Sequence, residues 1–166
     1  MLNGKEWSAM PTVVLRLVNE SDLDGIFEQM RDPVSVQMAA FTAEDPNDRA
    51  AFDSHMAKIM SSSDVTVRAI TCEDRLVGTI GRFVLDGVTE VTYWLDRSSW
   101  GKGIASRALE LLLEDVSERP VRARVASDNV GSLRVLQKAG FETVGTEVSY
   151  APARGAEIEE TILELS

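Results

Sequence analysis

The chain has 166 residues, which is the size of a single domain, and its 44% hydrophobic and 27% charged residues are typical of globular proteins. Seventeen basic residues against 27 acidic ones give a net charge of −10, which disfavours binding to nucleic acids and to anionic membranes. One cysteine, Cys72, and one histidine, His55, exclude a disulfide framework, a cysteine-based zinc cluster and a metal site of three histidines.

The N-terminal segment 1–11 is polar, shows no secretory pattern and is expected to be a loose extension. Residues 12–166 contain no linker, internal repeat or low-complexity stretch, so we expect one domain there, opening with a strand over 12–17. No apolar run approaches the about 18 residues that a membrane helix needs. We therefore expect a soluble, cytoplasmic protein.

After the first strand, apolar residues recur at helical spacing in three short segments. Ser21 and Asp24 fit a capping box at the start of the first helix. A second helix is expected over 34–40. A third is predicted to open with Asp45 as its N-cap and Pro46 at its first helical position.

The apolar period then changes to that of strands. Val65, Val67 and Ala69 alternate with polar residues, as in a half-buried strand. The dipeptide Asp86-Gly87 is typical of a tight hairpin turn between two further strands. These patterns predict an antiparallel meander over residues 64–95.

The second half alternates strands and helices, which completes an α+β order with a β-α-β crossover. Pro120 blocks the continuation of one helix, Asp128 or Asn129 caps the next, and Gly140 ends it. The expected elements are a helix over 104–116, a strand over 121–126, a helix over 129–139 and strands over 141–150 and 157–165.

The most informative segment is a glycine loop between a strand and a helix, because a helix start offers free amides to a phosphate. A nucleoside-triphosphate loop is excluded, since Gly103 follows Lys102 where Ser or Thr is required. A dinucleotide loop is excluded because Ser106 stands where a third glycine is required. The pyrophosphate loop of acyl-CoA-dependent acetyltransferases, [QR]-x-x-G-x-[GA], fits at Gly103 and Ala105, with Trp100 in place of Gln or Arg. A turn that binds nothing is the alternative.

A second motif lies about 25 residues further on. Asn129, Ser132, Lys138, Gly140 and Phe141 fill the pattern N-x-x-[AS]-x-x-h-h-x-K-x-G-F, where h is apolar. With the glycine loop before it, the chain resembles the GNAT superfamily of N-acetyltransferases. The resemblance implies an α/β/α sandwich with a mixed central sheet of about six or seven strands, in which the β-α-β crossover carries the cofactor site.

The residues before the glycine loop narrow the resemblance. The segments Tyr93-Trp94-Leu95-Asp96 and Trp100-Gly101-Lys102-Gly103-Ile104-Ala105 look like the RimJ/RimL-like branch, in which a tryptophan at the position of Trp100 is common. The resemblance implies that acetyl-CoA is the cosubstrate, with its pyrophosphate on the loop amides and its pantetheine arm along Trp94 and Leu95. The implied cofactor-binding residues are Trp94, Leu95, Trp100, Gly101, Lys102, Gly103, Ile104, Ala105, Ser106, Asn129 and Ser132.

The catalytic residues are less clear from the sequence. Many family members protonate the leaving thiolate with a tyrosine whose position is taken here by Leu136. Ser132 matches a serine thought to replace it in the RimJ/RimL-like branch, with water or a merely helix-capping role as alternatives. Glu90 is the candidate base, acting through water, with Glu142 and Glu147 as rivals and a solvated strand carboxylate as the structural alternative.

The resemblance predicts direct acetyl transfer to a primary amine, either a protein N-terminus or a small molecule, without a metal. Met38 and Phe41 are candidates for the wall of the acceptor site. Because the tyrosine is missing, an acyl-CoA-binding sensor or interaction module is the alternative. No nucleic-acid or membrane partner is expected, and homodimerisation, common in this branch, stays open.

Overall fold

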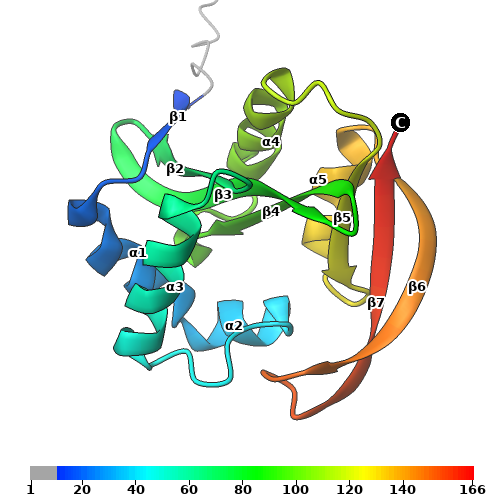
Figure 1. Ribbon diagram of the computed structural model, residues 1–166, viewed down its shortest axis with the longest axis horizontal. Helices are drawn as coiled ribbons and strands as arrows, with labels where there is room; N and C mark the ends of the chain where they lie inside the picture. Colours follow the sequence, from blue (N-terminus) through cyan, green and yellow to red (C-terminus); the bar gives the residue numbers. More distant parts are fainter. Residues whose placement is uncertain (1–10) are drawn as a thin grey trace, which may run out of the picture.

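The computed structural model describes residues 11–166, so nearly all of the expected extension over 1–11 lies outside the described residues. A mixed sheet of seven strands in the order β1-β2-β3-β4-β5-β7-β6 forms the centre of the protein (Figure 1). This confirms the expected α+β fold. The strands are β1 (Val13–Leu17), β2 (Thr66–Cys72), β3 (Arg75–Leu85), β4 (Val88–Leu95), β5 (Val121–Ala126), β6 (Glu142–Ala151) and β7 (Ala156–Leu165). The helices are the 3-10 turns η1 (Glu20–Asp22) and η2 (Arg97–Ser99), and α1 (Leu23–Met30), α2 (Pro33–Ala39), α3 (Arg49–Ser61), α4 (Ile104–Glu114) and α5 (Val130–Lys138).

The meander predicted over 64–95 is confirmed as β2, β3 and β4, which pair antiparallel in sequence order. Its second turn has Asp86 at φ 51° and Gly87 at φ 77°. Two successive left-handed residues match the right-handed twist of the flanking strands, and Asp-Gly adopts them readily. The local sequence is therefore sufficient to set this turn.

Two predicted helix starts are wrong. The Asp48 side chain caps α3 by accepting a hydrogen bond from the Ala51 amide at 3.0 Å, whereas Asp45 accepts from the Asn47 amide at 2.9 Å and only turns the chain before the helix. The capping box expected at Ser21 and Asp24 lies two residues earlier, at Asn19 and Asp22.

The shift at the first helix has a tertiary cause. The Asp22 carboxylate accepts from the Asn19 amide at 2.7 Å and from the Arg16 guanidinium at 2.7 Å. The hydrogen bonds from Arg16 lower the pKa of Asp22 despite its burial. Because a buried carboxylate needs such a partner, the ion pair with β1 selects Asp22 as the residue that closes the box.

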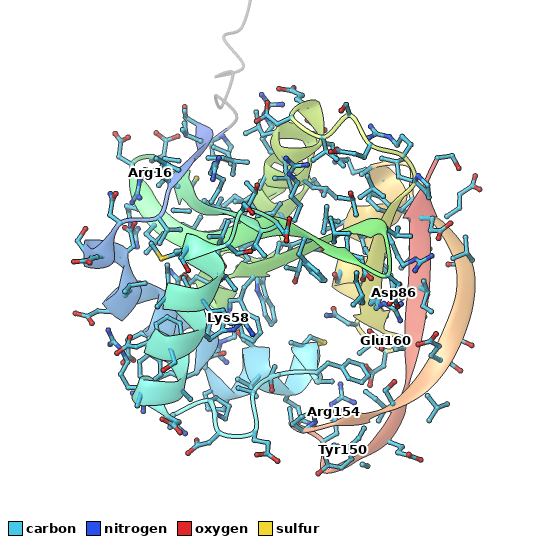
Figure 2. All side chains as sticks on the ribbon, viewed as in Figure 1. Arg16, Lys58, Asp86, Tyr150, Arg154 and Glu160 are labelled. Carbon is cyan, nitrogen blue, oxygen red and sulfur yellow. The ribbon has the colours of Figure 1, made fainter. Side chains whose placement is uncertain are left out.

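The start of α5 resolves the choice left open between Asp128 and Asn129. The Asn129 side chain accepts from the Ser132 amide at 3.2 Å and caps the helix. Asp128 instead pairs with Arg154 at 2.7 Å. Arg154 also donates to the Gln37 carbonyl at 2.8 Å, so it links the β6–β7 turn, where Figure 2 shows it, to α2 and to the start of α5.

Helices cover both faces of the sheet. The main core lies between the sheet and α4 and α5, and it contains Ile80, Leu109 and Leu163. A smaller core, with Ile26 and Met56, lies under α1 and α3, which Figure 1 shows beside each other at the end of the sheet away from β6 and β7. The result is the expected α/β/α sandwich.

The sheet opens in its middle, between β4 and β5. These strands are parallel, and they pair only through Thr89 with Val121 and Glu90 with Arg122. Within the described residues, β4 and β5 form no backbone pairs beyond these two. β5 continues to pair with β7 as far as Ala126. The last residues of β4 therefore leave one side of the strand open to a ligand.

Candidate active site

The glycine loop predicted to bind a phosphate ends at α4. Gly101 and Gly103 have φ values of 73° and 79°, a left-handed conformation that favours glycine. A Cβ atom added at either position would meet no atom within 4 Å beyond the neighbouring residues of the chain, so the loop faces open space. The first helical bond of α4 runs from the Arg107 amide to the Gly103 carbonyl, which leaves the preceding amides of this turn without a partner inside the helix.

A cavity of about 410 Å³ lies beside this loop. It is enclosed by the end of β4, the glycine loop, the start of α5 and one side of α2. Of the predicted cofactor-binding residues, Lys102 alone does not line it. The residues that do are Trp94, Leu95, Trp100, Gly101, Gly103, Ile104, Ala105, Ser106, Asn129 and Ser132.

Two tryptophans fix the walls of this cavity, which we call the cofactor cavity. The Trp94 indole donates to the Gln29 carbonyl of α1 at 3.0 Å, so it ties the end of β4 to the first helix. The Trp100 indole donates to the Leu95 carbonyl at 3.0 Å and folds the loop back on the strand. Trp100 therefore has a structural role where the general family motif has Gln or Arg.

A pair of hydroxyl groups lies where the cofactor cavity meets β4. The Tyr93 hydroxyl and the Ser132 hydroxyl are 2.6 Å apart, and the amide of Ser132 is held by the Asn129 cap. Burial raises the pKa of Tyr93, although its bond to Ser132 opposes the shift. Tyr93 was not among the catalytic candidates, and the signal that could have found it was its place in the branch segment Tyr93-Trp94-Leu95-Asp96.

A second cavity, of about 750 Å³, lies on the α1 and α3 side of the sheet. Tyr93 and Trp94 line both cavities, so the two meet at the end of β4. Of the two residues expected in an acceptor wall, Phe41 lines the second cavity and Met38 lines the cofactor cavity. The second cavity reaches β4 from the face opposite the main core. We call it the acceptor-side cavity, because Phe41 of the expected acceptor wall lines it.

The carboxylates considered as bases lie elsewhere. Glu90 is only 2% exposed, and its carboxylate lies 3.2 Å from the Arg124 guanidinium, which also pairs with Glu147 at 3.0 Å. Neither of these carboxylates, nor Glu142 at the start of β6, lines either cavity. Burial, together with the charges of Glu147 and Glu90, raises the pKa of the nearby Glu160, and Arg124 opposes this shift.

Among residues 11–166, no helix is both long and apolar enough to cross a membrane. In the same part of the chain, no group of three or more metal-ligating side chains gathers in one place.

Comparison with known proteins identifies the fold. The chain spans about half the length of the curated relatives that it matches first. One of them is the probable N-acetyltransferase YjcK of Bacillus subtilis, which is 36% identical to this chain over 81 residues. The match covers 44% of this chain and 45% of that protein. RimL, the ribosomal L7/L12 alpha-N-protein acetyltransferase in complex with coenzyme A, superimposes with a TM-score of 0.80 at 18% identity over 93% of each chain. Mycobacterium smegmatis RimJ in complex with CoA-disulfide gives 0.75 at 19% identity, over 92% of this chain and 81% of that one.

These neighbours are consistent with the RimJ/RimL-like branch that the segments around Tyr93 and Trp100 indicated. The acetyltransferase (GNAT) domain model matches residues 12–142, which include both motifs and the whole of the cofactor cavity lining. The chain therefore belongs to the GNAT family of acetyltransferases.

Proposed function

We propose that the protein transfers an acetyl group from acetyl-CoA to a primary amine, of a protein N-terminus or of a small molecule. The observation that carries the proposal is the meeting of two cavities at Tyr93 and Trp94, one beside the glycine loop and one on the opposite face. Such an arrangement brings a nucleotide-bearing thioester and a second substrate together from two sides of one strand.

The residues of the cofactor cavity fit coenzyme A. Free amides at the start of α4 and the positive end of its dipole suit a pyrophosphate, and Gly101 and Gly103 present no side chain between the backbone and the ligand. The open side of β4, beyond Glu90, gives backbone groups to the amide-rich pantetheine arm. RimL and RimJ bind coenzyme A or its disulfide on the same fold, which supports this assignment.

The thioester supplies an activated acetyl carbonyl, and the protein has to orient it and manage two protons. A new carbon–nitrogen bond forms as the carbon–sulfur bond breaks, so the amine loses one proton and the thiolate gains one. Ser132 is the proposed donor to the thiolate, Tyr93 replaces its proton through the 2.6 Å hydrogen bond, and Tyr93 regains a proton from water in the adjoining cavities. Because burial raises the pKa of Tyr93, the phenol is in its protonated, donating form at neutral pH.

The proton from the amine is proposed to leave through water. Glu90 was the candidate base, but its carboxylate is paired with Arg124 and lies outside both cavities. Protein α-amines have pKa values of about 8, so a useful fraction is already neutral near pH 7. A water chain in the acceptor-side cavity is sufficient for such amines.

The test is release of free thiol from acetyl-CoA in the presence of N-terminal peptides, polyamines and aminoglycosides, alongside calorimetry of coenzyme A binding. We expect binding together with turnover of at least one amine. Binding without turnover across the panel would favour the acyl-CoA-binding sensor, which Leu136 at the usual tyrosine position suggests. Absence of both would exclude the proposal.

A further inference from the structure

We propose that the acceptor-side cavity selects small amphipathic amines, which have an apolar or aromatic body and a second cationic group besides the amine that reacts. The inference rests on the proposed acetyl transfer, because it assigns the acceptor to this cavity. A volume of about 750 Å³ falls in the range of small-molecule sites. The composition of its wall and of its rim then defines the class of ligand.

The wall is apolar where α1 and α3 face the sheet. The rings of Phe27 and Phe52 lie 5.3 Å apart and are tilted by 51°. Met30, Met56 and Ile59 extend this surface, and threonine hydroxyls are its main neutral polar groups. An aromatic or branched aliphatic body can displace water here and gain the free energy of apolar burial, whereas a highly polar body would lose hydration.

The rim carries negative charge that the protein leaves uncompensated. Asp45 and Asp48 in the α2–α3 loop, and Asp64 after α3, line the cavity, and none of them forms an ion pair within residues 11–166. Two basic residues of α3 lie near this wall: Lys58 is exposed and does not line the cavity, and Arg49 is already paired. Arg49 binds Asp24 at 2.8 Å and Asp53 at 2.9 Å.

Two further arginines do not cancel this charge either. Arg31, which stacks on the Phe27 ring, pairs with Glu28 at 3.1 Å. Arg82 also lines the cavity, but its guanidinium pairs with the Glu118 carboxylate at 3.3 Å, and Glu118 lies outside the lining. Apart from the exposed His55, the rim is therefore acidic, and it favours a ligand with a positive charge beyond the neutral amine that attacks.

The floor of the cavity disfavours an extended peptide. β2 pairs with β1 and β3, and β3 pairs with β2 and β4, so the backbone groups of these strands are already satisfied in the sheet. A peptide recognised as an added strand needs a free edge, and the open edge of β4 faces the cofactor cavity. A small amine with few polar groups loses least in this surrounding.

The experiment compares kcat/KM for four acceptors of matched size and for one N-terminal peptide. The small acceptors are phenethylamine, 1,4-bis(aminomethyl)benzene, 4-(aminomethyl)benzoate and spermidine. We expect the aromatic diamine to exceed the aromatic monoamine by about 5–10-fold at low salt, beyond the factor of two from its second amine, and the carboxylate to be the poorest. The preference should shrink in 0.5 M NaCl, about the level at which surface charges are largely screened.

The variant that tests the rim is the triple change Asp45→Asn, Asp48→Asn and Asp64→Asn. Asparagine keeps the side-chain oxygens that accept from the Asn47 and Ala51 amides, so the chain turn and the helix cap are retained while the charges are lost. The preference for the diamine should fall to about the statistical factor of two. Asp74→Asn is the matched control, because Asp74 lies in the β2–β3 turn outside the cavity at φ 63°, which asparagine also adopts.

Three results would overturn the inference. One is an unchanged diamine preference in the triple variant. Another is a higher kcat/KM for the peptide or for spermidine than for the aromatic diamine. The third is turnover of other amines, such as aminoglycosides, without turnover of any of the five acceptors. Failure of the underlying function is distinguishable, since it would abolish turnover of every amine in the wider panel of peptides, polyamines and aminoglycosides, whether or not coenzyme A binds in calorimetry.

Discussion

The two cavities that meet at Tyr93 and Trp94 are built in different ways. The cofactor cavity is lined mainly by the end of β4, the glycine loop and the starts of α4 and α5, so its glycines and its cap have fixed places along the chain. The acceptor-side cavity is made of side chains from α1, α3 and three strands, brought together from distant parts of the sequence. A backbone site has a local sequence signature because only some residues permit its φ values, whereas a side-chain site depends on packing.

The largest expected effect comes from breaking the backbone site. Gly103→Asp combines a strained left-handed residue at φ 79° with a negative charge beside the proposed pyrophosphate. We expect coenzyme A to bind about 100-fold more weakly, which corresponds to about 2.7 kcal/mol. Calorimetry measures the loss, and Gly155→Asp is the control, because Gly155 has φ 58° in the β6–β7 turn, outside both cavities. Equal losses in both variants would show that strain alone is responsible.

The hydroxyl pair at the junction should give the next largest effect. Ser132→Ala should lower kcat by about 100-fold and Tyr93→Phe by about 10-fold, with the double variant no worse than Ser132→Ala. Because burial raises the pKa of Tyr93, kcat should not decline through loss of this proton below pH about 10. Single-turnover rates from pH 6 to 10 measure both effects.

The chain offers a matched control for the hydroxyl pair. Ser127 and Thr161 form a hydroxyl–hydroxyl bond of the same 2.6 Å length, and neither residue lines a cavity. Ser127→Ala should leave kcat within about 2-fold of the parent value, since it removes the same kind of bond away from the site. An equal fall in kcat for Ser127→Ala and Ser132→Ala would remove Ser132 from the proposed mechanism.

Filling the acceptor-side cavity should affect the use of amines without affecting the binding of coenzyme A. Thr92 is exposed on β4 and lines only the acceptor-side cavity. Thr92→Trp places a ring in that space on a strand that tolerates aromatic residues, so kcat/KM for amines should fall by about 10-fold or more. The affinity for coenzyme A should be unchanged in calorimetry. A parallel loss of coenzyme A affinity would mean that the two cavities are not separate sites.

The smallest effect on turnover is expected at Glu90. Glu90→Gln should change kcat by less than about 3-fold, but it should lower the free energy of unfolding by about 1–3 kcal/mol, because Arg124 loses a buried partner. Urea unfolding and steady-state rates measure the two quantities. Glu147→Gln, which removes the more exposed partner of Arg124, is the comparison and should destabilise less. A large fall in kcat with normal stability would restore Glu90 as the base.

The long-range contacts that the sequence did not predict have the same origin as this contrast. Asp45-Pro46 and Asp48 are both plausible helix starts, and only the hydrogen bond to Ala51 distinguishes them. Glu90 has the spacing of a residue near the cofactor, but β4 lies beside Arg124 of β5, and the parallel pairing of these strands puts the carboxylate in an ion pair. The importance of Tyr93 depends on Ser132, which is 39 residues away in the sequence.

The sequence by itself determined the order of the elements, the meander and the glycine loop, and it narrowed the cap of α5 to Asp128 or Asn129, because each depends on periodicity or on residues that permit few local conformations. It also indicated the family, since two motifs stand in the expected order. Tertiary structure decided which hydroxyls meet, which carboxylates are neutralised by arginine and which remain on the acceptor-side rim. Those properties depend on distances between strands and helices far apart in the chain, and no local pattern encodes them.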